Sequence, residues 1–337
     1  MAAAALAYRG GLALRGAAYA SGLLRTRRLP CRVVAVGNLT LGGTGKTPLV
    51  ELLARRLGHR GRRVAILSRG YGRRGTADLI VSDGQRLLAT AADAGDEPYL
   101  LARRLPGVPV LVGRDRARAG ATALARFRPD VLLLDDGFQQ RRLRTDLAIV
   151  CLDARAPWGE RGLFPRGTLR EPPAALGRAH LLVLTHADAA ADPAALEARL
   201  RRHAPAAPIA HATYEVEAVE DVATGGRLAV EALRTRPALA FAGIAAPDNF
   251  RRTLVALGVA PRELVTFPDH HGYTADDVAA LEARARAAGA EALVTTEKDA
   301  VRLPGLRQLP IWVVRVRLRL GDADRAWWTA FDARAAE

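Results

Sequence analysis

Short apolar runs alternate along most of this chain with longer segments in which apolar residues recur at helical spacing. Runs of this length that are rich in Val, Leu and Ala indicate buried strands, and their alternation with helices is typical of a parallel sheet. The first set comprises Val33–Val36, Val64–Leu67, Val108–Val112, Val131–Leu134, Leu147–Leu152 and His180–Leu184. A second set comprises Ala238–Gly243, Leu264–Phe267, Ala292–Thr295 and Ile311–Leu320.

A less regular stretch, residues 205–237, separates the two sets and contains prolines and the turn Thr224-Gly225-Gly226. The chain has 337 residues, half of them hydrophobic, which favours two domains with cores of their own. We therefore predict an α/β fold with two domains. The expected boundaries are 1–28 for an amino-terminal helix, 29–208 for the first domain, 209–237 for a linker region and 238–337 for a smaller carboxyl-terminal domain.

Two segments near the expected linker alternate with the period of a strand. Residues 214–220 alternate acids with apolar residues, and residues 314–320 alternate apolar residues with arginines. If the two segments pair antiparallel, Glu215 and Glu217 would face the arginines across the ladder and the pair would form a hinge. Each segment could equally lie at the edge of a different sheet with its charges in solvent.

A glycine-rich turn, Leu41-Gly42-Gly43-Thr44-Gly45-Lys46-Thr47, follows the first strand and precedes a helical segment. Strand, glycine turn, Lys-Thr and helix in this order are the arrangement of a P-loop, although Thr40 stands where a further glycine is usual. Only two of the 50 basic residues are lysines, and a phosphate loop favours the compact charge of lysine over the broad fork of arginine. We expect a nucleoside triphosphate on these residues, the alternative being a chance glycine-rich turn.

The strand at Val131–Leu134 ends in two acids, Asp135 and Asp136. This is the form of a Walker B element, in which a carboxylate at the end of a strand reaches the Mg²⁺ that a P-loop hydroxyl, here Thr47, also binds. The alternative is a solvated turn. The P-loop upstream favours the metal role.

Two further groups of polar residues follow predicted strands or begin helices. Asp96 lies at a probable helix start and could be an N-cap or a base that orients an attacking hydroxyl. His270 and His271 follow Asp269 at the end of a strand, without a third ligand at the spacing that zinc requires. The segment 295–299 contains the second lysine, Lys298, as part of a salt-bridged turn or as a phosphate contact.

The formal charge of +15 favours an anionic partner, either nucleic acid or an acidic membrane surface. The arginines are spread along the chain and aromatic residues make up 5%, which does not indicate a stacking groove for single strands. Arg69, Arg73 and Arg114 lie on loops after strands, where open α/β sheets bind ligands, although solvated arginine is the plainer explanation. Cys31 and Cys151 have no metal or disulfide spacing, which fits a reducing cytoplasm.

The first 28 residues are rich in Ala, Leu and Gly, are interrupted by Arg9 and Arg15, and end in Arg25-Thr26-Arg27-Arg28. The uninterrupted apolar stretch is too short for a signal peptide or a membrane span. We expect a helix that lies on a membrane surface, with an ordinary helix capping the fold as the alternative.

Together these motifs resemble one family, the tetraacyldisaccharide 4′-kinases of lipid A biosynthesis, over nearly the whole chain. The matching segments, in family order, are 36–48, 68–73, 95–98, 112–116, 135–139, 167–172, 267–270 and 296–299. Thr40 also fits the family pattern. The resemblance implies two α/β/α domains, the first with a P-loop NTPase-like parallel sheet, joined by a strand linker, and an amino-terminal helix on the cytoplasmic face of the bacterial inner membrane.

The resemblance also implies the reaction, an ATP- and Mg²⁺-dependent phosphorylation of the 4′-hydroxyl of a tetraacyldisaccharide 1-phosphate glycolipid. Gly42, Gly43, Thr44, Gly45, Lys46 and Thr47 would bind the nucleotide, and Thr47, Asp135, Asp136 and Glu171 the metal. Asp96 would accept the proton of the hydroxyl, paired with His270 from the other domain, while Arg170 neutralises phosphate charge. Arg69, Tyr71, Arg73 and Arg114 would contact the glycolipid. We expect neither nucleic acid nor an obligate protein partner.

Two other classes of function stay open on the sequence. A regulatory GTPase is suggested by Thr185-His186-Ala187-Asp188 after a strand, although His186 replaces the lysine of a guanine-reading turn. A nucleic-acid-stimulated ATPase is suggested by the charge.

Overall fold

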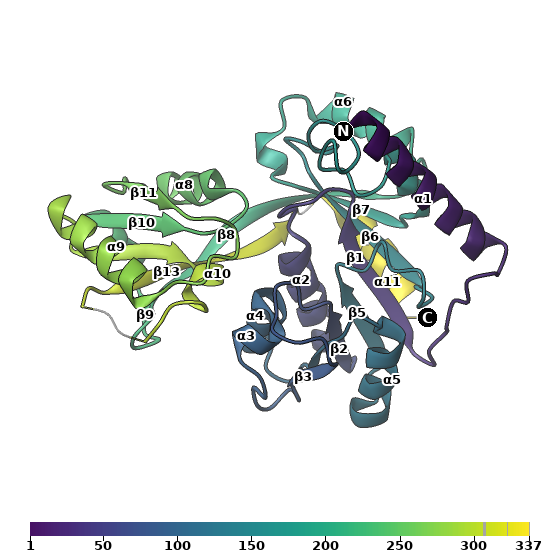
Figure 1. The fold of residues 1–337 in the computed structure, drawn as a ribbon, viewed down its shortest axis with the longest axis horizontal. Coiled ribbons are helices and arrows are strands. Elements are labelled where there is room, and N and C mark those ends of the chain that lie inside the picture. Colours follow the sequence, from purple (N-terminus) through teal and green to yellow (C-terminus); the bar gives the residue numbers. More distant parts are fainter. Residues whose placement is uncertain (306–307, 322, 337) are drawn as a thin grey trace.

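Two lobes make up the protein, joined by a pair of long strands (Figure 1). The computed structural model describes residues 1–305, 308–321 and 323–336. We call residues 1–214 and 318–336 the large lobe and residues 216–316 the small lobe, because the apolar cores divide at these positions. Both ends of the chain lie on the large lobe.

The large lobe alternates strands with helices, as expected for a P-loop domain. Its strands are β1 (Arg32–Asn38), β2 (Val64–Ser68), β3 (Leu79–Ser82), β4 (Val110–Val112), β5 (Val131–Asp135), β6 (Leu147–Asp153) and β7 (Leu181–Thr185). Its helices are α1 (Ala2–Ala20), α2 (Lys46–His59), α3 (Ala91–Ala94), α4 (Asp96–Arg104), α5 (Arg116–Phe127), α6 (Pro193–Arg201) and α11 (Arg325–Ala336), with 3-10 turns at Pro173–Arg178 and Ala187–Ala189.

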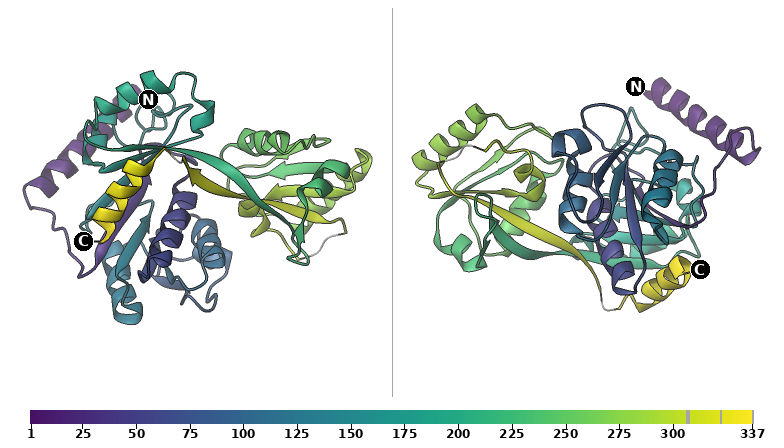
Figure 2. Two further views of the ribbon diagram at one scale, coloured as in Figure 1. Left: turned by 180° about the vertical axis from the view of Figure 1, so that it is seen from behind. Right: turned by 90° about the horizontal axis from the view of Figure 1, so that it is seen from below.

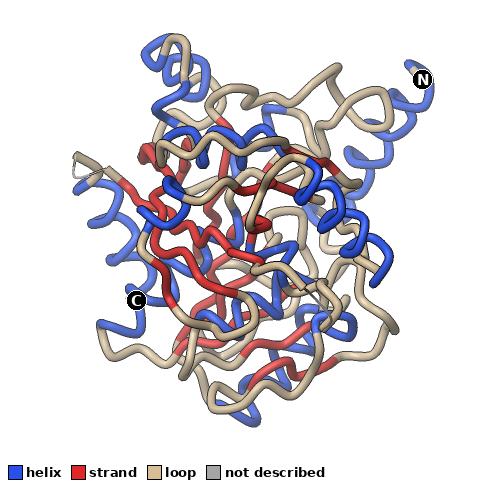
Figure 3. Tube along the Cα trace, turned by 90° about the vertical axis from the view of Figure 1, so that its left-hand side faces the viewer, coloured by secondary structure: helices blue, strands red, loops and turns tan. Residues whose placement is uncertain are grey.

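The small lobe is built on the two long strands that connect it, β8 (Ile209–Asp221) and β13 (Ile311–Leu320). Its other strands are β9 (Arg227–Leu228), β10 (Ala238–Ala242), β11 (Leu264–Thr266) and β12 (Ala292–Thr296), and its helices are α7 (Val230–Thr235), α8 (Pro247–Ala256), α9 (Ala275–Ala287) and α10 (Glu297–Ala300). Seen along the long axis, strands occupy the interior and most helices lie outside them (Figure 3).

One continuous sheet runs through both lobes, in the order β11-β10-β12-β13-β8-β7-β6-β1-β5-β2-β4-β3, with β9 paired to β8. Most neighbours are parallel, and the exceptions among the described strands are β3 with β4, β8 with β13 and β8 with β9. All ten predicted strands are confirmed, with small differences at their ends. The sequence analysis missed β3 and β9, short strands that carry little periodic signal.

The antiparallel pairing of residues 214–220 with residues 314–320 is confirmed. Val316 lies opposite Val216 and Arg317 opposite Glu215. Glu215 Oε2 is 3.0 Å from Arg317 Nη2, and its Oε1 is 2.8 Å from Arg319 Nη1. The ladder therefore joins the lobes with one apolar and one charged face, as the alternating pattern predicted.

The expected position of Glu217 is wrong in detail. The register shifts between Arg315 and Val316, so that Arg315 lies opposite Ala218 while Val316 lies opposite Val216. Glu217 is the extra residue of this bulge, and one of its carboxylate oxygens lies 4.0 Å from Arg104 Nη2. Arg315 pairs with Glu220 instead, at 2.6 Å.

The last helix, α11, packs on the large lobe, although the sequence grouped residues 238–337 together. Trp327 and Phe331 are buried in the core beneath α2, and Trp327 Nε1 donates to the carbonyl of Leu182 at 2.9 Å. Asp332 pairs with Arg56 at 2.6 Å. The chain thus crosses to the small lobe in β8 and returns in β13, and its end completes the first core.

The amino-terminal helix α1 lies along the outside of the large lobe (Figure 2). None of its residues is buried, and its contacts include a hydrogen bond from the Tyr8 hydroxyl to the Arg170 carbonyl at 2.9 Å. Leu6 and Leu14 are 69% and 74% exposed. Among the described residues, no helix combines the length and the apolar character that crossing a membrane requires.

A buried arginine, Arg104, fastens the junction of the lobes. Its guanidinium contacts Glu51 of α2 at 2.6 Å and Glu297 of α10, and donates to the carbonyl of Val316 at 3.0 Å. Burial alone would lower the pKa of Arg104, but the charges of Glu297 and Glu51 outweigh burial and raise it above its ordinary value. Arg104 therefore stays ionised, and its contacts connect α2, α4, α10 and β13.

Arg104→Met should lower the free energy of unfolding by about 1–3 kcal/mol, because it removes the buried cation that Glu51 and Glu297 share and leaves each carboxylate with one arginine, Arg55 or Arg315. Urea denaturation followed by circular dichroism measures the change. Arg317→Met is the matched control, since it also removes an arginine between the lobes but from an exposed pair, and it should change stability far less. Equal losses in the two variants would contradict the structural role given to the buried cluster.

Candidate active site

The P-loop begins directly after β1, at the centre of the large-lobe sheet. Leu39, Thr40 and Thr44 are buried, and α2 begins at Lys46, so the loop wraps the amino end of this helix. The position places backbone N–H groups and the positive end of the helix dipole at one point, which is a ready anion site. Strand, loop and helix follow one another as the sequence predicted.

Gly45 makes the tightest approach in the loop. It has φ of 82°, and a Cβ there would collide with the Tyr214 hydroxyl and lie 2.9 Å from Thr185 Cγ2. The Thr185 hydroxyl also donates to the Thr44 carbonyl at 3.3 Å. Gly45 is thus required by both its backbone conformation and the lack of space.

Lys46, Asp136 and Arg170 form one charge cluster beside the loop. Asp136, at φ of 55°, lies 3.9 Å from Lys46 Nζ and 2.6 Å from Arg170 Nη1. Burial alone would raise the pKa of Asp136, but Lys46 and Arg170 outweigh burial and lower it. Asp136 therefore stays charged and holds two cations that could also contact phosphate.

Thr47 and Asp135 lie close enough to share a cation. Thr47 Oγ1 is 3.4 Å from Asp135 Oδ1, and the Ser68 hydroxyl is 3.4 Å from Asp135 Oδ2. Burial raises the pKa of Asp135 to about 6, an effect that Lys46 opposes and that the charges of Asp136 and Glu97 reinforce. Hydroxyl and carboxylate oxygens are ligands that Mg²⁺ binds, and the raised pKa of Asp135 indicates that this carboxylate lacks nearby positive charge. Mg²⁺ commonly takes only a few protein ligands, with phosphate oxygens and water as the others.

Glu171 has a different neighbour. It is 5% exposed and pairs with Arg178, whose guanidinium lies 4.4 Å from the centre of the Phe138 ring. Within the part of the chain that the structure describes, three or more carboxylate, histidine or cysteine side chains do not gather as a metal site. The structure brings Thr47 together with Asp135, while the nearest charged partners of Asp136 and Glu171 are arginines and Lys46.

The two lobes meet at Asp96 and His270. Asp96 begins α4 of the large lobe, and His270, at φ of 60°, follows β11 of the small lobe. His270 Nδ1 and Asp96 Oδ2 are 2.8 Å apart. This hydrogen bond raises the pKa of His270 above its ordinary value, against the opposing effects of burial and of Lys298. The contact that the resemblance implied is therefore present between residues 174 positions apart.

The arginine loop at residues 69–73 borders this contact. The ring of Tyr71 is 70% exposed, and its centre lies 5.5 Å from that of His270. Arg73 packs over Gly70, where a Cβ would lie 2.6 Å from Arg73 Cδ. Arg69 and Arg114 are exposed. A surface that carries an aromatic ring and arginines suits a sugar that carries phosphate.

Arg116 belongs to the arginine loop Arg114-Asp115-Arg116 that the sequence indicates as a possible ligand contact, but the sequence assigned it no role of its own. It is 4% exposed, and burial lowers its pKa to about 10, although the charges of Asp135 and Asp136 oppose this change. Its Nη1 donates to the Gly113 carbonyl. Its position in the sequence could have indicated this location, because it follows Asp115, whose carboxylate caps α5, in the same loop as Arg114.

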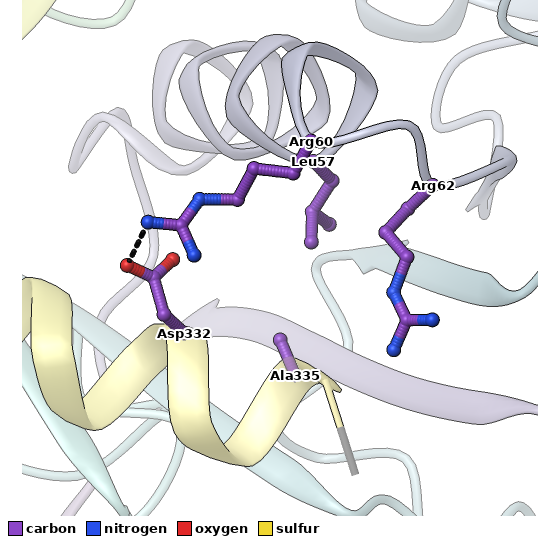
Figure 4. Close-up of a pocket in the computed structure, with 5 residues that line it drawn as sticks. All are labelled: Leu57, Arg60, Arg62, Asp332 and Ala335. Atoms are coloured by element: carbon purple, nitrogen blue, oxygen red, sulfur yellow. Dashed lines mark ion pairs between the residues drawn. The ribbon is translucent and has the colours of Figure 1, made fainter.

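A depression lined by Leu57, Arg60, Arg62, Asp332 and Ala335 lies elsewhere, between the carboxyl end of α2 and α11 (Figure 4). Arg60 and Asp332 are 2.7 Å apart across it. Because the P-loop lies at the other end of α2, about 20 Å away along the helix, this depression is no part of the site.

Comparison with known proteins places the chain among lipid A enzymes. A profile of the family described as tetraacyldisaccharide-1-P 4′-kinase (LpxK) matches residues 1–335. The tetraacyldisaccharide 4′-kinase of Syntrophus aciditrophicus (strain SB) is 45% identical over 318 residues, which cover 91% of this chain and 84% of that protein. The corresponding protein of Anaeromyxobacter dehalogenans (strain 2CP-C) is 50% identical over 298 residues, with 88% and 79% coverage.

A solved structure is similar over almost the full length. It is a crystal structure of LpxK from Aquifex aeolicus in complex with ATP, with 32% sequence identity, a TM-score of 0.77 and coverage of 97% of both chains. This likeness extends to the mostly parallel sheet of the present chain.

Gly45→Ala should distort the P-loop, because the new Cβ meets Tyr214 and Thr185 and because φ of 82° is strained for alanine. We expect it to lower the free energy of unfolding by about 1–3 kcal/mol and to abolish nucleotide binding, measured by urea denaturation and calorimetry. Gly43→Ala is the matched control for stability, because nothing lies within 4 Å of a Cβ there. If the Gly45→Ala protein is as stable as the Gly43→Ala protein, Tyr214 and Thr185 do not restrict the space at Gly45.

Proposed function

The chain belongs to the tetraacyldisaccharide-1-P 4′-kinase family, and from that premise we propose how its residues carry out the reaction. The enzyme transfers phosphate from ATP to the 4′-hydroxyl of a tetraacylated disaccharide 1-phosphate, which gives lipid IVA in lipid A biosynthesis. Phosphoryl transfer of this kind needs positioning and charge stabilisation more than covalent chemistry. The roles below follow from that requirement.

Residues 42–47 bind the triphosphate of ATP. The backbone N–H groups of the loop and the amino end of α2 face one point, and Lys46 adds a positive charge to it. Arg170 also contacts phosphate, and its present partner Asp136 keeps its guanidinium beside Lys46. Both cations are thus arranged before charge develops on the transferred group, which is how such sites favour a transition state.

Thr47 and Asp135 hold Mg²⁺, with Asp136 and Glu171 as further candidates. A bound ion would supply positive charge that offsets the charge of the phosphates. Asp135 suits this role because it is buried, with the Thr47 hydroxyl 3.4 Å from one of its oxygens and the Ser68 hydroxyl 3.4 Å from the other. Asp136 and Glu171 would have to exchange their arginine partners for the metal.

The hydrogen bond between Asp96 and His270 carries the proposed chemistry. Asp96 accepts the proton of the 4′-hydroxyl. The oxygen of that hydroxyl attacks the γ-phosphorus of ATP, and the bond from this phosphorus to the oxygen that leaves with ADP breaks. His270 orients Asp96 from the small lobe, as a hydrogen-bonded partner does in other acid–base pairs. Because one partner comes from each lobe, the pair forms only where the lobes meet, which restricts hydrolysis of ATP by water.

The two lobes act as two α/β/α domains joined by β8 and β13. The proposed P-loop domain takes residues 29–208 with α11 added, and the smaller domain begins in β8 and ends in β13. The glycolipid contacts Arg69, Tyr71, Arg73 and Arg114, which is supported by the contact of Tyr71 with His270 of the other lobe.

We place α1 on the cytoplasmic face of the bacterial inner membrane, as a peripheral or monotopic contact. A helix without buried residues, with exposed leucines and a following run of arginines, suits an anionic membrane surface. Acyl chains then stay in the bilayer while the disaccharide reaches the site. No nucleic acid and no obligate protein partner enter this scheme.

A GTPase is not favoured. The His186 ring stands where a guanine-reading turn has lysine, and it lies against Tyr214, with 4.9 Å between ring centres, and 3.3 Å from Asp153. A nucleic-acid-stimulated ATPase has only the net charge in its favour. Full-length similarity to kinases named for a disaccharide lipid substrate outweighs it.

Transfer of labelled phosphate from ATP to a tetraacyldisaccharide 1-phosphate in detergent tests the function directly. Asp96→Ala and His270→Ala should each lower kcat by about 100-fold or more. The double variant should be little less active than the less active of the two single variants, because the pair acts as a unit. His271→Ala is the matched control, since His271 pairs with Asp277 within the small lobe. Fully additive losses would mean that Asp96 and His270 act separately.

Leu6→Glu with Leu14→Glu should weaken co-sedimentation with anionic lipid vesicles, because burying an acidic side chain in the interface is unfavourable. Activity on a detergent-dispersed substrate should stay near that of the unchanged enzyme. Leu87→Glu with Leu88→Glu is the control, since these leucines are exposed outside α1. Unchanged vesicle binding of the α1 variant would place the membrane contact elsewhere.

A further inference from the structure

Lys298, one of two lysines in the chain, has three close partners where the lobes meet. Its Nζ lies 3.0 Å from Glu97 Oε1, 3.2 Å from Asp269 Oδ1 and 3.2 Å from His270 Nε2. Glu97 belongs to α4 of the large lobe, whereas Asp269 and His270 belong to the same lobe as Lys298. The ammonium group therefore touches both lobes and one member of the Asp96–His270 pair.

The contact with His270 constrains where the imidazole proton lies. An ammonium group has three N–H donors and no acceptor, so the ring nitrogen that faces it has to accept. His270 Nε2 is then free of hydrogen, and the proton lies on Nδ1, which faces Asp96 Oδ2 at 2.8 Å. Lys298 and Asp96 thus favour the same neutral tautomer from opposite edges of the ring.

We propose that Lys298 is a positioning residue for the phosphoryl transfer: it opposes the charging of His270, it holds the proton of the neutral ring toward Asp96, and it ties α10 to α4 through Glu97. The inference rests on the proposed function, because it assigns the Asp96–His270 pair to the reaction.

A neutral His270 makes Asp96 the better base. An imidazolium beside a carboxylate stabilises the ionised form and lowers the affinity of that carboxylate for the proton of a sugar hydroxyl. A cation held against Nε2 opposes formation of the imidazolium, so Asp96 faces a neutral N–H donor instead of a charged ring. The hydrogen bond to Asp96 acts in the other direction and raises the pKa of His270, as do the charges of Glu97 and Asp269.

The groups around His270 define what its titration can report. Asp96 and Glu97 face it from α4, Asp269 from its own loop and Lys298 from α10. The ring of Tyr71 lies beside it. Arg302 Nε is 3.6 Å from Asp96 Oδ2, the same oxygen that His270 Nδ1 contacts. Lys298 is the positive group in direct contact with the imidazole among these neighbours.

The decisive experiment compares Lys298→Met with Glu97→Gln in the full-length enzyme. Lys298→Met should lower kcat by about 10- to 100-fold, because His270 and Asp96 are less well placed. It should also move the acid limb of kcat/KM to higher pH by about one unit, since loss of a neighbouring positive charge favours the imidazolium. Glu97→Gln removes the link to α4 but leaves the ammonium on His270, and the loss of a negative charge should move the acid limb to lower pH.

Two further variants serve as controls. Lys298→Arg keeps a positive donor at the same place, so its acid limb should stay near that of the wild type even where its larger group lowers kcat. Arg251→Met removes one positive charge from an exposed pair with Asp248 on α8, and its profile should match the wild type. An acid limb that Lys298→Met leaves unmoved, or that Glu97→Gln moves in the same direction, overturns the proposal whatever the change in kcat.

Nitrogen-15 NMR of histidine-labelled protein separates this inference from the proposed function, since it needs no substrate. His270 signals, assigned by comparison with His270→Gln, should show a protonated Nδ1 and an unprotonated Nε2 near neutral pH in the wild type. Lys298→Met should raise the apparent pKa of the ring. Identical titrations in the two proteins overturn the role of Lys298, whereas absence of phosphate transfer by the wild type overturns the proposed function alone.

Discussion

The antiparallel pairing of β8 with β13 is the constraint on which the rest of the structure depends. The chain enters the small lobe through one of these strands and leaves through the other, so their register sets where every small-lobe residue lies. The bulge at Glu217 turns one carboxylate toward Arg104, which already binds Glu51 and Glu297. The ladder and this buried cluster together bring His270 within hydrogen-bond distance of Asp96, although the two residues come from separate cores.

The charges at the site are arranged for an anion. Arg116 is buried near Asp135 and Asp136, and its lowered pKa shows how poorly burial is compensated without further negative charge. The raised pKa of Asp135 indicates that this carboxylate lacks nearby positive charge. A polyphosphate with its cation would relieve both, because it brings negative charge to the arginine and positive charge to the acid. The excess of basic over acidic residues in the whole chain is consistent with this local arrangement.

Much of the fold could be predicted from the sequence because each strand carries its own local signal. Runs such as Val131–Leu134 are apolar throughout, and the P-loop combines a strand, glycines and a Lys-Thr pair within a short segment. The features that could not be predicted depend on tertiary contacts and on the shapes of turns. The return of α11 to the first core is decided by the burial of Trp327 and Phe331 under α2, and the pairing of Glu171 with Arg178 depends on a turn whose shape no periodicity predicts. Lys298 stood out as one of two lysines, but its three partners come from two lobes.

Helix α4 shows how these long-range contacts combine. Its first turn carries Asp96 and Glu97 and its last residue is Arg104, while two consecutive residues of α10, Glu297 and Lys298, contact its two ends with opposite charge. At the carboxyl end the Arg104 side chain is 8% exposed and also binds Glu51, so separating this end from Glu297 would strip a buried cation of one partner, and it resists opening. The pair at the amino end is more than one-fifth exposed on both side chains, so water and salt can replace it at lower cost. The two ends of α4 therefore differ in how easily they part from the small lobe, and the end that parts more easily is the one that carries Asp96.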